Sequence, residues 1–148
     1  MRSITIAGSG PSASQIDHVT VATKKRSVSS YYLFCRFPFA YSLKKGDTIP
    51  MMVYYNRGGC ECRKCPQCTV ERYAVNSAYW DDYYRRFSKK KPSSGLCAIF
   101  AAVERWEPST IGLIGFDWVI DKHPDWQHDS VAELKAIESL VDIKDLRL

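Results

Sequence analysis

The sequence predicts an α/β protein with three layers, α/β/α, around a mostly parallel sheet. Short apolar segments typical of buried strands alternate along the chain with segments whose apolar residues recur at helical spacing. The first strand-like segment runs directly into a glycine-rich turn, as is typical of nucleotide-binding α/β folds. A chain of 148 residues suits one domain with a sizeable core. We therefore expect a single domain over residues 1–148.

Five segments are predicted to form strands. Residues 4–7 are short and apolar, residues 18–23 alternate between apolar and polar, and residues 111–117 have the apolar density of a central strand. Two further strands are expected within the aromatic segment 31–41, which Pro38 interrupts, and within residues 48–55.

Three helices follow from spacing and capping. Ser77 can cap a helix in which Tyr79, Tyr83 and Phe87 recur every four residues. The clearest helix spans residues 94–106, with its apolar side chains at Leu96, Ile99, Phe100, Val103 and Trp106. A last helix is expected to start near Asp129, with Leu134, Ile137 and Val141 on one face. This alternation of strands and helices predicts a Rossmann-like arrangement.

The charge of the chain is divided between its two parts. Residues 1–95 hold 16 Lys and Arg against 6 Asp and Glu, whereas residues 96–148 hold 5 against 10. Such asymmetry favours a surface that attracts anions such as phosphates, whether of a nucleotide or of a polymer. The longest apolar stretch, residues 96–103, is far shorter than the ~20 residues that span a bilayer. We expect a cytoplasmic protein with no membrane span.

The turn after the first strand is the first candidate ligand site. Gly8, Ser9 and Gly10 permit close backbone approach, and a helix starting at Pro11 would present free N–H groups and a partial positive charge to a phosphate. The alternative is a turn that only folds the chain back.

The start of the helix at 94–106 is the second candidate. Ser93 or Ser94 is placed to cap it, Gly95 lets a ligand approach its first turn, and three lysines, residues 89–91, precede it. The alternative is a capped core helix that follows a solvated run of charge.

The third candidate is a histidine–glutamate pair at the start of the last helix. His128 and Glu133 are separated by four residues. Imidazole is the natural general base near neutral pH, and a nearby carboxylate can orient it. The alternative is an exposed histidine followed by the capping residue Asp129.

In order and spacing these segments resemble the sialyltransferase family of glycosyltransferases. Residues 6–17 resemble the opening of its large motif, a strand, a glycine-containing turn and an Ile-Asp pair. Residues 92–116 resemble its small motif, including the closing Gly-Phe, and residues 128–133 resemble its very small motif. The resemblance covers roughly half of the chain.

The resemblance implies a metal-independent, inverting transfer of a sugar from a CMP-linked donor to an acceptor hydroxyl. It assigns catalysis to His128, as the general base, and to Glu133. It assigns donor binding to Gly8, Ser9, Gly10, Ser93, Ser94, Gly95 and His123, the last by correspondence with the histidine of the third motif. The lysines at 89–91 would help to stabilise the charge of the leaving phosphate.

A cysteine cluster within the loop 57–72 predicts a metal site. Four thiols fall within nine residues, at Cys60, Cys62, Cys65 and Cys68. Four sulfur ligands suit tetrahedral Zn²⁺ in a structural site, and neighbouring basic residues favour thiolates. An iron–sulfur cluster or unmetallated thiols are the alternatives.

Two other functions compete with the transferase. One is a nucleic-acid-binding or adaptor protein on a degenerate transferase fold, favoured by the basic half and by aromatic residues interleaved with arginines in residues 79–86. The other is a hydrolase that acts on a sugar nucleotide. Release of free sugar without an acceptor would distinguish the hydrolase from a transferase.

Overall fold

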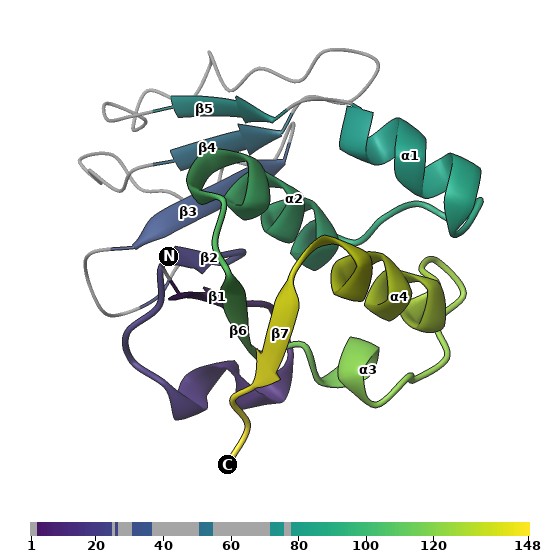
Figure 1. The fold of residues 1–148 in the computed structure, drawn as a ribbon. Coiled ribbons are helices and arrows are strands. Elements are labelled where there is room, and N and C mark those ends of the chain that lie inside the picture. Colours follow the sequence, from purple (N-terminus) through teal and green to yellow (C-terminus); the bar gives the residue numbers. More distant parts are fainter. Residues whose placement is uncertain (1–2, 25, 27–30, 37–50, 55–71, 76–77) are drawn as a thin grey trace.

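The computed structural model describes residues 3–24, 26, 31–36, 51–54, 72–75 and 78–148. Its centre is a seven-stranded sheet in which every pair of neighbouring strands is parallel (Figure 1). In chain order the strands are β1 Ser3–Ala7, β2 Val21–Ala22, β3 Tyr32–Arg36, β4 Met51–Tyr54, β5 Arg72–Val75, β6 Thr110–Ile114 and β7 Asp142–Asp145. The prediction of an α/β protein with a parallel sheet is confirmed.

The order of the strands reverses once. Across the sheet it runs β5-β4-β3-β2-β1-β6-β7, so the chain moves outward from β1 to β5 and then returns to the opposite side of β1. β1 and β6 are paired along their whole length, with Ile6 opposite Leu113 and Ala7 opposite Ile114. In open parallel sheets, ligands bind beyond the carboxyl ends of the two strands that flank such a reversal. The loops that follow β1 and β6 therefore mark the first place to look for a site.

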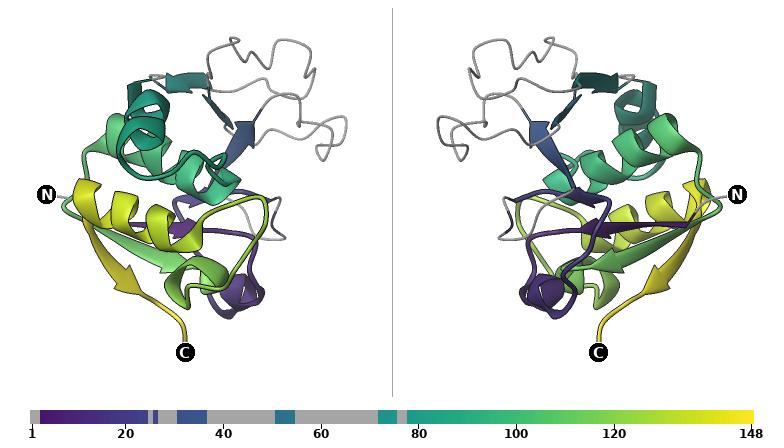
Figure 2. Two further views of the ribbon diagram at one scale, coloured as in Figure 1. Left: turned by 90° about the vertical axis from the view of Figure 1, so that its right-hand side faces the viewer. Right: turned by 90° about the vertical axis from the view of Figure 1, so that its left-hand side faces the viewer.

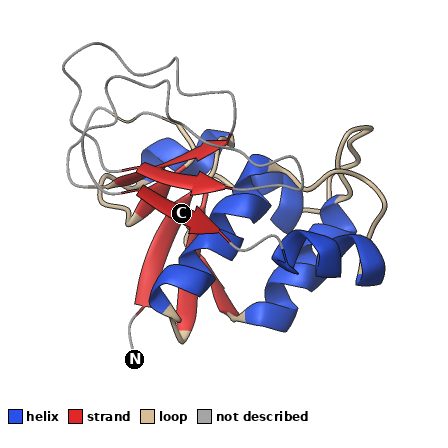
Figure 3. Cartoon of the chain, turned by 90° about the horizontal axis from the view of Figure 1, so that it is seen from above, coloured by secondary structure: helices blue, strands red, loops and turns tan. Residues whose placement is uncertain are grey.

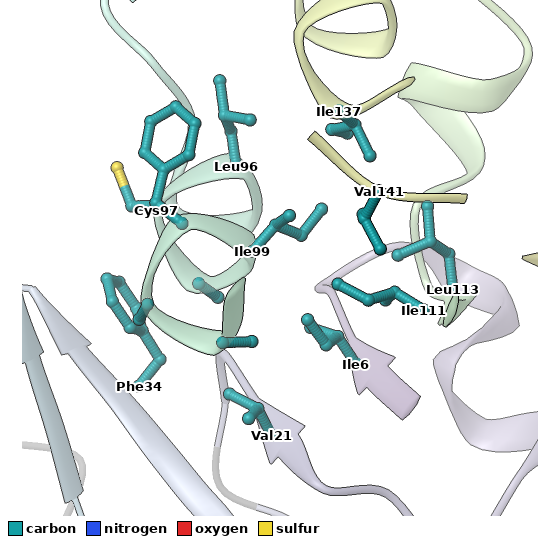
Figure 4. Close-up of a cluster of buried hydrophobic side chains, with 14 of the residues drawn as sticks. Ile6, Val21, Phe34, Leu96, Cys97, Ile99, Ile111, Leu113, Ile137 and Val141 are labelled. Atoms are coloured by element: carbon teal, nitrogen blue, oxygen red, sulfur yellow. The ribbon is translucent and has the colours of Figure 1, made fainter. Parts of the chain in front are cut away.

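The helix α2, Ser94–Trp106, occupies the centre of the core, and its bounds are those that the sequence predicts. Ser93 caps it by accepting a hydrogen bond from the N–H of Leu96, and Glu107 ends it in the left-handed conformation. Seven of its residues, Leu96 to Ala102, are buried. Figure 4 shows Ile99 of α2 pointing toward the side chains of β1 and β6, in the same apolar cluster as Leu96 and Phe34.

Two further helices pack beside α2. α1, Ala78–Arg86, contributes the buried side chains of Trp80 and Tyr83, and its Tyr79 stacks on Phe100 of α2 at 5.4 Å between ring centroids. α4, Ser130–Leu140, starts at the predicted cap, since Asp129 accepts from the N–H of Ala132. Figures 1 and 3 show α4 alongside α2, and the two helices are in contact.

Two predicted segments differ from the structure, and three elements were not predicted. The turn after β1 leads into a short 3₁₀ helix, η1, Pro11–Gln15, and the second strand keeps only two of its six expected residues. The sequence analysis missed β5, β7 and the short helix α3, Asp117–Ile120. β7 was missed because it is a polar strand whose residues are mostly exposed, and it leads to a C-terminus that lies next to η1 (Figure 2).

Several expectations fall outside the described residues. The segments 37–50 and 55–71, which connect β3, β4 and β5, belong to this part, so the second layer of helices and the cysteine-rich loop stay predictions. Within the described ranges, no helix is both long and apolar enough to cross a bilayer.

Candidate active site

The glycine turn after β1 packs directly against the turn after β6. The N–H of Gly8 donates to the carbonyl of Ile114 at 2.8 Å, and the N–H of Gly10 donates to the carbonyl of Gly115 at 2.7 Å. A Cβ at Gly8 would lie 2.5 Å from the Gly115 carbonyl oxygen. The structure therefore uses these two glycines, and their N–H groups, to join the two turns.

A carboxylate already fills the start of the 3₁₀ helix. One oxygen of Asp117 accepts from the backbone N–H of Ser12 at 3.2 Å and from its hydroxyl at 2.8 Å. The same hydroxyl accepts from the N–H of Gly115 at 2.8 Å. This is where the sequence analysis expected a donor phosphate. Of the three residues predicted in this turn, Ser9 is the one whose side chain is exposed to a ligand.

The carboxyl ends of β6 and β7 are acidic. Arg147 bonds Asp121 at 2.6 Å and Asp145 at 2.8 Å, and lies 3.8 Å from Asp117. The hydrogen bonds from Arg147 hold the pKa values of Asp121 and Asp145 below their usual range. Three carboxylates surround a single guanidinium here. The excess negative charge at the carboxyl ends of β6 and β7 would therefore repel a phosphate.

The three predicted donor-binding residues at the start of α2 differ in what they contact. The buried hydroxyl of Ser93 donates to Oε1 of Glu133 at 2.5 Å and accepts from the N–H of Leu96 at 3.2 Å. A Cβ at Gly95 would lie 2.7 Å from the ring of Phe116, so this glycine serves the packing of α2 on the turn after β6. Ser94 is exposed and is the residue of this turn that a ligand can reach.

The ring of His128 is hydrogen-bonded to the backbone. Its Nδ1 lies 2.6 Å from the carbonyl oxygen of Lys91, and its ring lies 6.0 Å from that of Trp118. Because a carbonyl can only accept, Nδ1 carries a proton, and in the neutral ring Nε2 then presents its lone pair. The group that orients His128 is thus a backbone carbonyl, which the sequence analysis did not foresee.

Glu133 lies against the start of α2. It is fully buried, and its second oxygen accepts from the N–H of Ser93 at 2.9 Å. His128 and Glu133 are therefore both bonded to the short segment between Lys91 and Ser93, so the structure brings the second and third predicted motifs together.

The remaining predicted donor-binding residue, His123, has an exposed side chain. Its Nε2 lies 3.9 Å from Asp121, within the acidic group around Arg147. Its carbonyl accepts from the hydroxyl of Ser130 at 2.7 Å, which ties the preceding loop to the start of α4. The lysines of the 89–91 run are exposed, and Nζ of Lys90 donates to the carbonyl of Asp125, in the loop between α3 and α4, at 3.2 Å.

The aromatic residues of α1 face the core. Trp80 and Tyr83 are buried, and Tyr84 and Phe87 pack against them. Such rings are unavailable for stacking on bases, although Arg85 and Arg86 remain exposed beside their partner Asp82.

The chain was compared with known proteins at the levels of sequence and structure. No family model, curated protein or solved structure matches it.

Sequence reasoning missed Ser12, Asp117 and the Lys91 carbonyl. Asp117 follows the end of β6, and a carboxylate just beyond a central parallel strand is a signal that could have been used. The Lys91 carbonyl carries no such signal, because every residue has one.

The cysteine cluster, Cys60, Cys62, Cys65 and Cys68, lies outside the described residues, and its metal is a prediction. Protein purified without chelator should contain about one zinc ion per chain by elemental analysis, because four thiolates complete a tetrahedral site. Replacing Cys60 and Cys62 together by Ser should remove the metal. Cys97→Ala is the matched control, since Cys97 is buried in α2, and it should keep the zinc. Iron with sulfide, or no metal, would contradict this expectation.

Proposed function

We propose that this protein is a glycosyltransferase of sialyltransferase type on a Rossmann-like fold. It transfers a sugar from a nucleotide-sugar donor, CMP-linked by resemblance, to the hydroxyl of an acceptor, and its chemistry needs no metal. The observation that carries the proposal is the bond between Nδ1 of His128 and the Lys91 carbonyl, because it leaves Nε2 free to accept a proton.

The reaction is a single displacement. Nε2 of His128 takes the proton of the acceptor hydroxyl while the acceptor oxygen bonds the anomeric carbon of the sugar. The bond from that carbon to the phosphate oxygen breaks on the opposite face, and the nucleotide leaves with the electron pair. The configuration of the sugar is therefore inverted.

Two features near His128 support binding of the leaving phosphate. The segment that bonds His128 leads directly into the first turn of α2, where Glu133 occupies the positive end of the helix and the exposed hydroxyl of Ser94 remains open to a ligand. The lysines at 89–91 precede it, and all three are exposed. Positive charge aimed at the developing phosphate charge supplies in this scheme what a metal supplies in other transferases.

Calorimetric titration with CMP, CDP, UDP and GDP tests the donor site. We expect selective binding of CMP. Ser94→Trp should abolish it, because an indole at this exposed position fills the space beside the first turn of α2. Ser139→Trp is the matched control, since Ser139 lies in the last turn of α4, and it should bind CMP as the wild type does.

Each outcome of the titration separates two functions. CMP binding that Ser94→Trp removes supports the transferase. Silence toward every nucleotide would contradict it and favour the alternative of a nucleic-acid-binding or adaptor protein. That alternative predicts oligonucleotide affinity that falls steeply with salt.

A further inference from the structure

Glu133 is a carboxylate without any contact with solvent. It lies on α4 at 0% exposure, and both of its oxygens accept from one residue, the N–H of Ser93 at 2.9 Å and its hydroxyl at 2.5 Å. A buried carboxylate is strongly unfavourable unless such donors satisfy it. The positive end of α2 also favours negative charge at this position. The pair therefore fixes the start of α2 to α4.

The bond to His128 starts from the same short segment. Lys91, whose carbonyl accepts from Nδ1, stands two residues before Ser93, and the buried Pro92 lies between them. Proline fixes its own φ, and Ser93 is extended, with φ −70° and ψ 162°. Few rotatable backbone bonds therefore separate the Ser93–Glu133 contact from the Lys91 carbonyl that bonds His128. Because Glu133 holds Ser93 in place, it also restricts the direction in which the Lys91 carbonyl points.

We propose that Glu133 is a positioning residue for His128 and that it acts through the backbone of the 91–93 segment. By holding Ser93 it places the Lys91 carbonyl at Nδ1 and so fixes the tautomer with Nε2 unprotonated. The role in catalysis rests on the proposed transferase function, whereas the effect on the tautomer does not.

The charge of Glu133 also affects a residue of α1. Burial and, next in size, the charge of Glu133 raise the pKa of Tyr83 of α1 above its usual value. Tyr83 is 1% exposed. The charge of Glu133 is thus linked to a buried residue of α1 as well as to the start of α2.

The test is the ¹⁵N NMR spectrum of the histidine rings at a pH where all are neutral. The chain has three histidines, so His18 and His123 serve as internal references for His128. In the wild type we expect His128 to be protonated at Nδ1. In Glu133→Gln and Ser93→Ala we expect the His128 signals to move toward a mixture of both tautomers, while the other two histidines stay unchanged.

Control variants separate positioning from general destabilisation. Glu138→Gln changes an exposed glutamate on the same helix and should leave every histidine signal as in the wild type. Ser93→Thr keeps both the hydroxyl and the helix cap and should keep the wild-type tautomer. If Glu133→Gln fails to fold, the comparison of Ser93→Ala with Ser93→Thr tests the proposal by itself. Unchanged His128 nitrogen signals in folded Glu133→Gln and Ser93→Ala would overturn the proposal.

An activity assay keeps the two proposals apart. If the transferase function holds, Glu133→Gln should lower kcat by about 10²-fold, because a base misplaced by about 1 Å loses that much. The KM for the donor should change much less. A tautomer that depends on Glu133 in a wild type that transfers no sugar would support the positioning role and contradict the transferase.

Discussion

Replacing His128 by Ala is expected to lower the rate of sugar transfer by about 10²–10⁴-fold, the usual contribution of a general base. The acceptor hydroxyl then loses the group that takes its proton. Binding of CMP should change little, because the proposed donor site at the start of α2 does not include His128. The measurement is the initial rate of CMP release from a CMP-sugar with a panel of glycan acceptors, beside a calorimetric titration with CMP.

His18→Ala is the matched control for this variant. His18 is exposed, lies between η1 and β2 and has no assigned role in the site, so its loss should leave sugar transfer unaffected. Retained turnover in His128→Ala would contradict the assignment of the base, and so would an equal loss of turnover in His18→Ala.

Gly115→Ala is expected to lower the free energy of unfolding by about 3 kcal/mol, near the top of the range for a residue forced into an unfavourable backbone conformation. Gly115 has φ +76°, and a Cβ there would lie 2.7 Å from the Gly8 carbonyl oxygen and 2.8 Å from Cβ of Ala13. Strain and overlap thus act together at the contact between the two turns. Urea denaturation measures the change.

The matched control is Gly112→Ala, three residues earlier along the same part of the chain. A Cβ at Gly112 would meet the end of the Leu146 side chain, which can rotate away, and its φ is ordinary. This variant should lose about 1 kcal/mol, as ordinary substitutions do. Equal losses for Gly112→Ala and Gly115→Ala would contradict a closely packed contact between the two turns.

The sequence predicts those elements that one local pattern defines. α2 was placed correctly because its apolar spacing and its serine cap agree. β1 and β6 were found because buried parallel strands are rich in apolar residues, although β6 ends at Ile114, three residues before the predicted end. β7 could not be predicted in this way, because no local pattern defines it and only its pairing with β6 makes it a strand.

The candidate site was predictable in its members and less so in their roles. The bonds that decide those roles join residues far apart in the chain: Ser12 with Asp117 across 105 positions, and Ser93 with Glu133 across 40. A glycine turn has the same sequence whether a phosphate or an aspartate lies against it. The spacing of His128 and Glu133 likewise does not reveal that a backbone segment stands between them.

The reversal of strand order has a consequence for how the chain folds. β1 lies at the centre of the finished sheet, yet its partner on one side, β6, begins more than a hundred residues later, at Thr110. During synthesis the edge of β1 that pairs with β6 remains without a partner, and Ile4 and Ile6 remain uncovered, until the ribosome has produced α2 and β6. Such high contact order predicts slow folding and a transient tendency to aggregate. Truncation before Thr110 should therefore give an insoluble product.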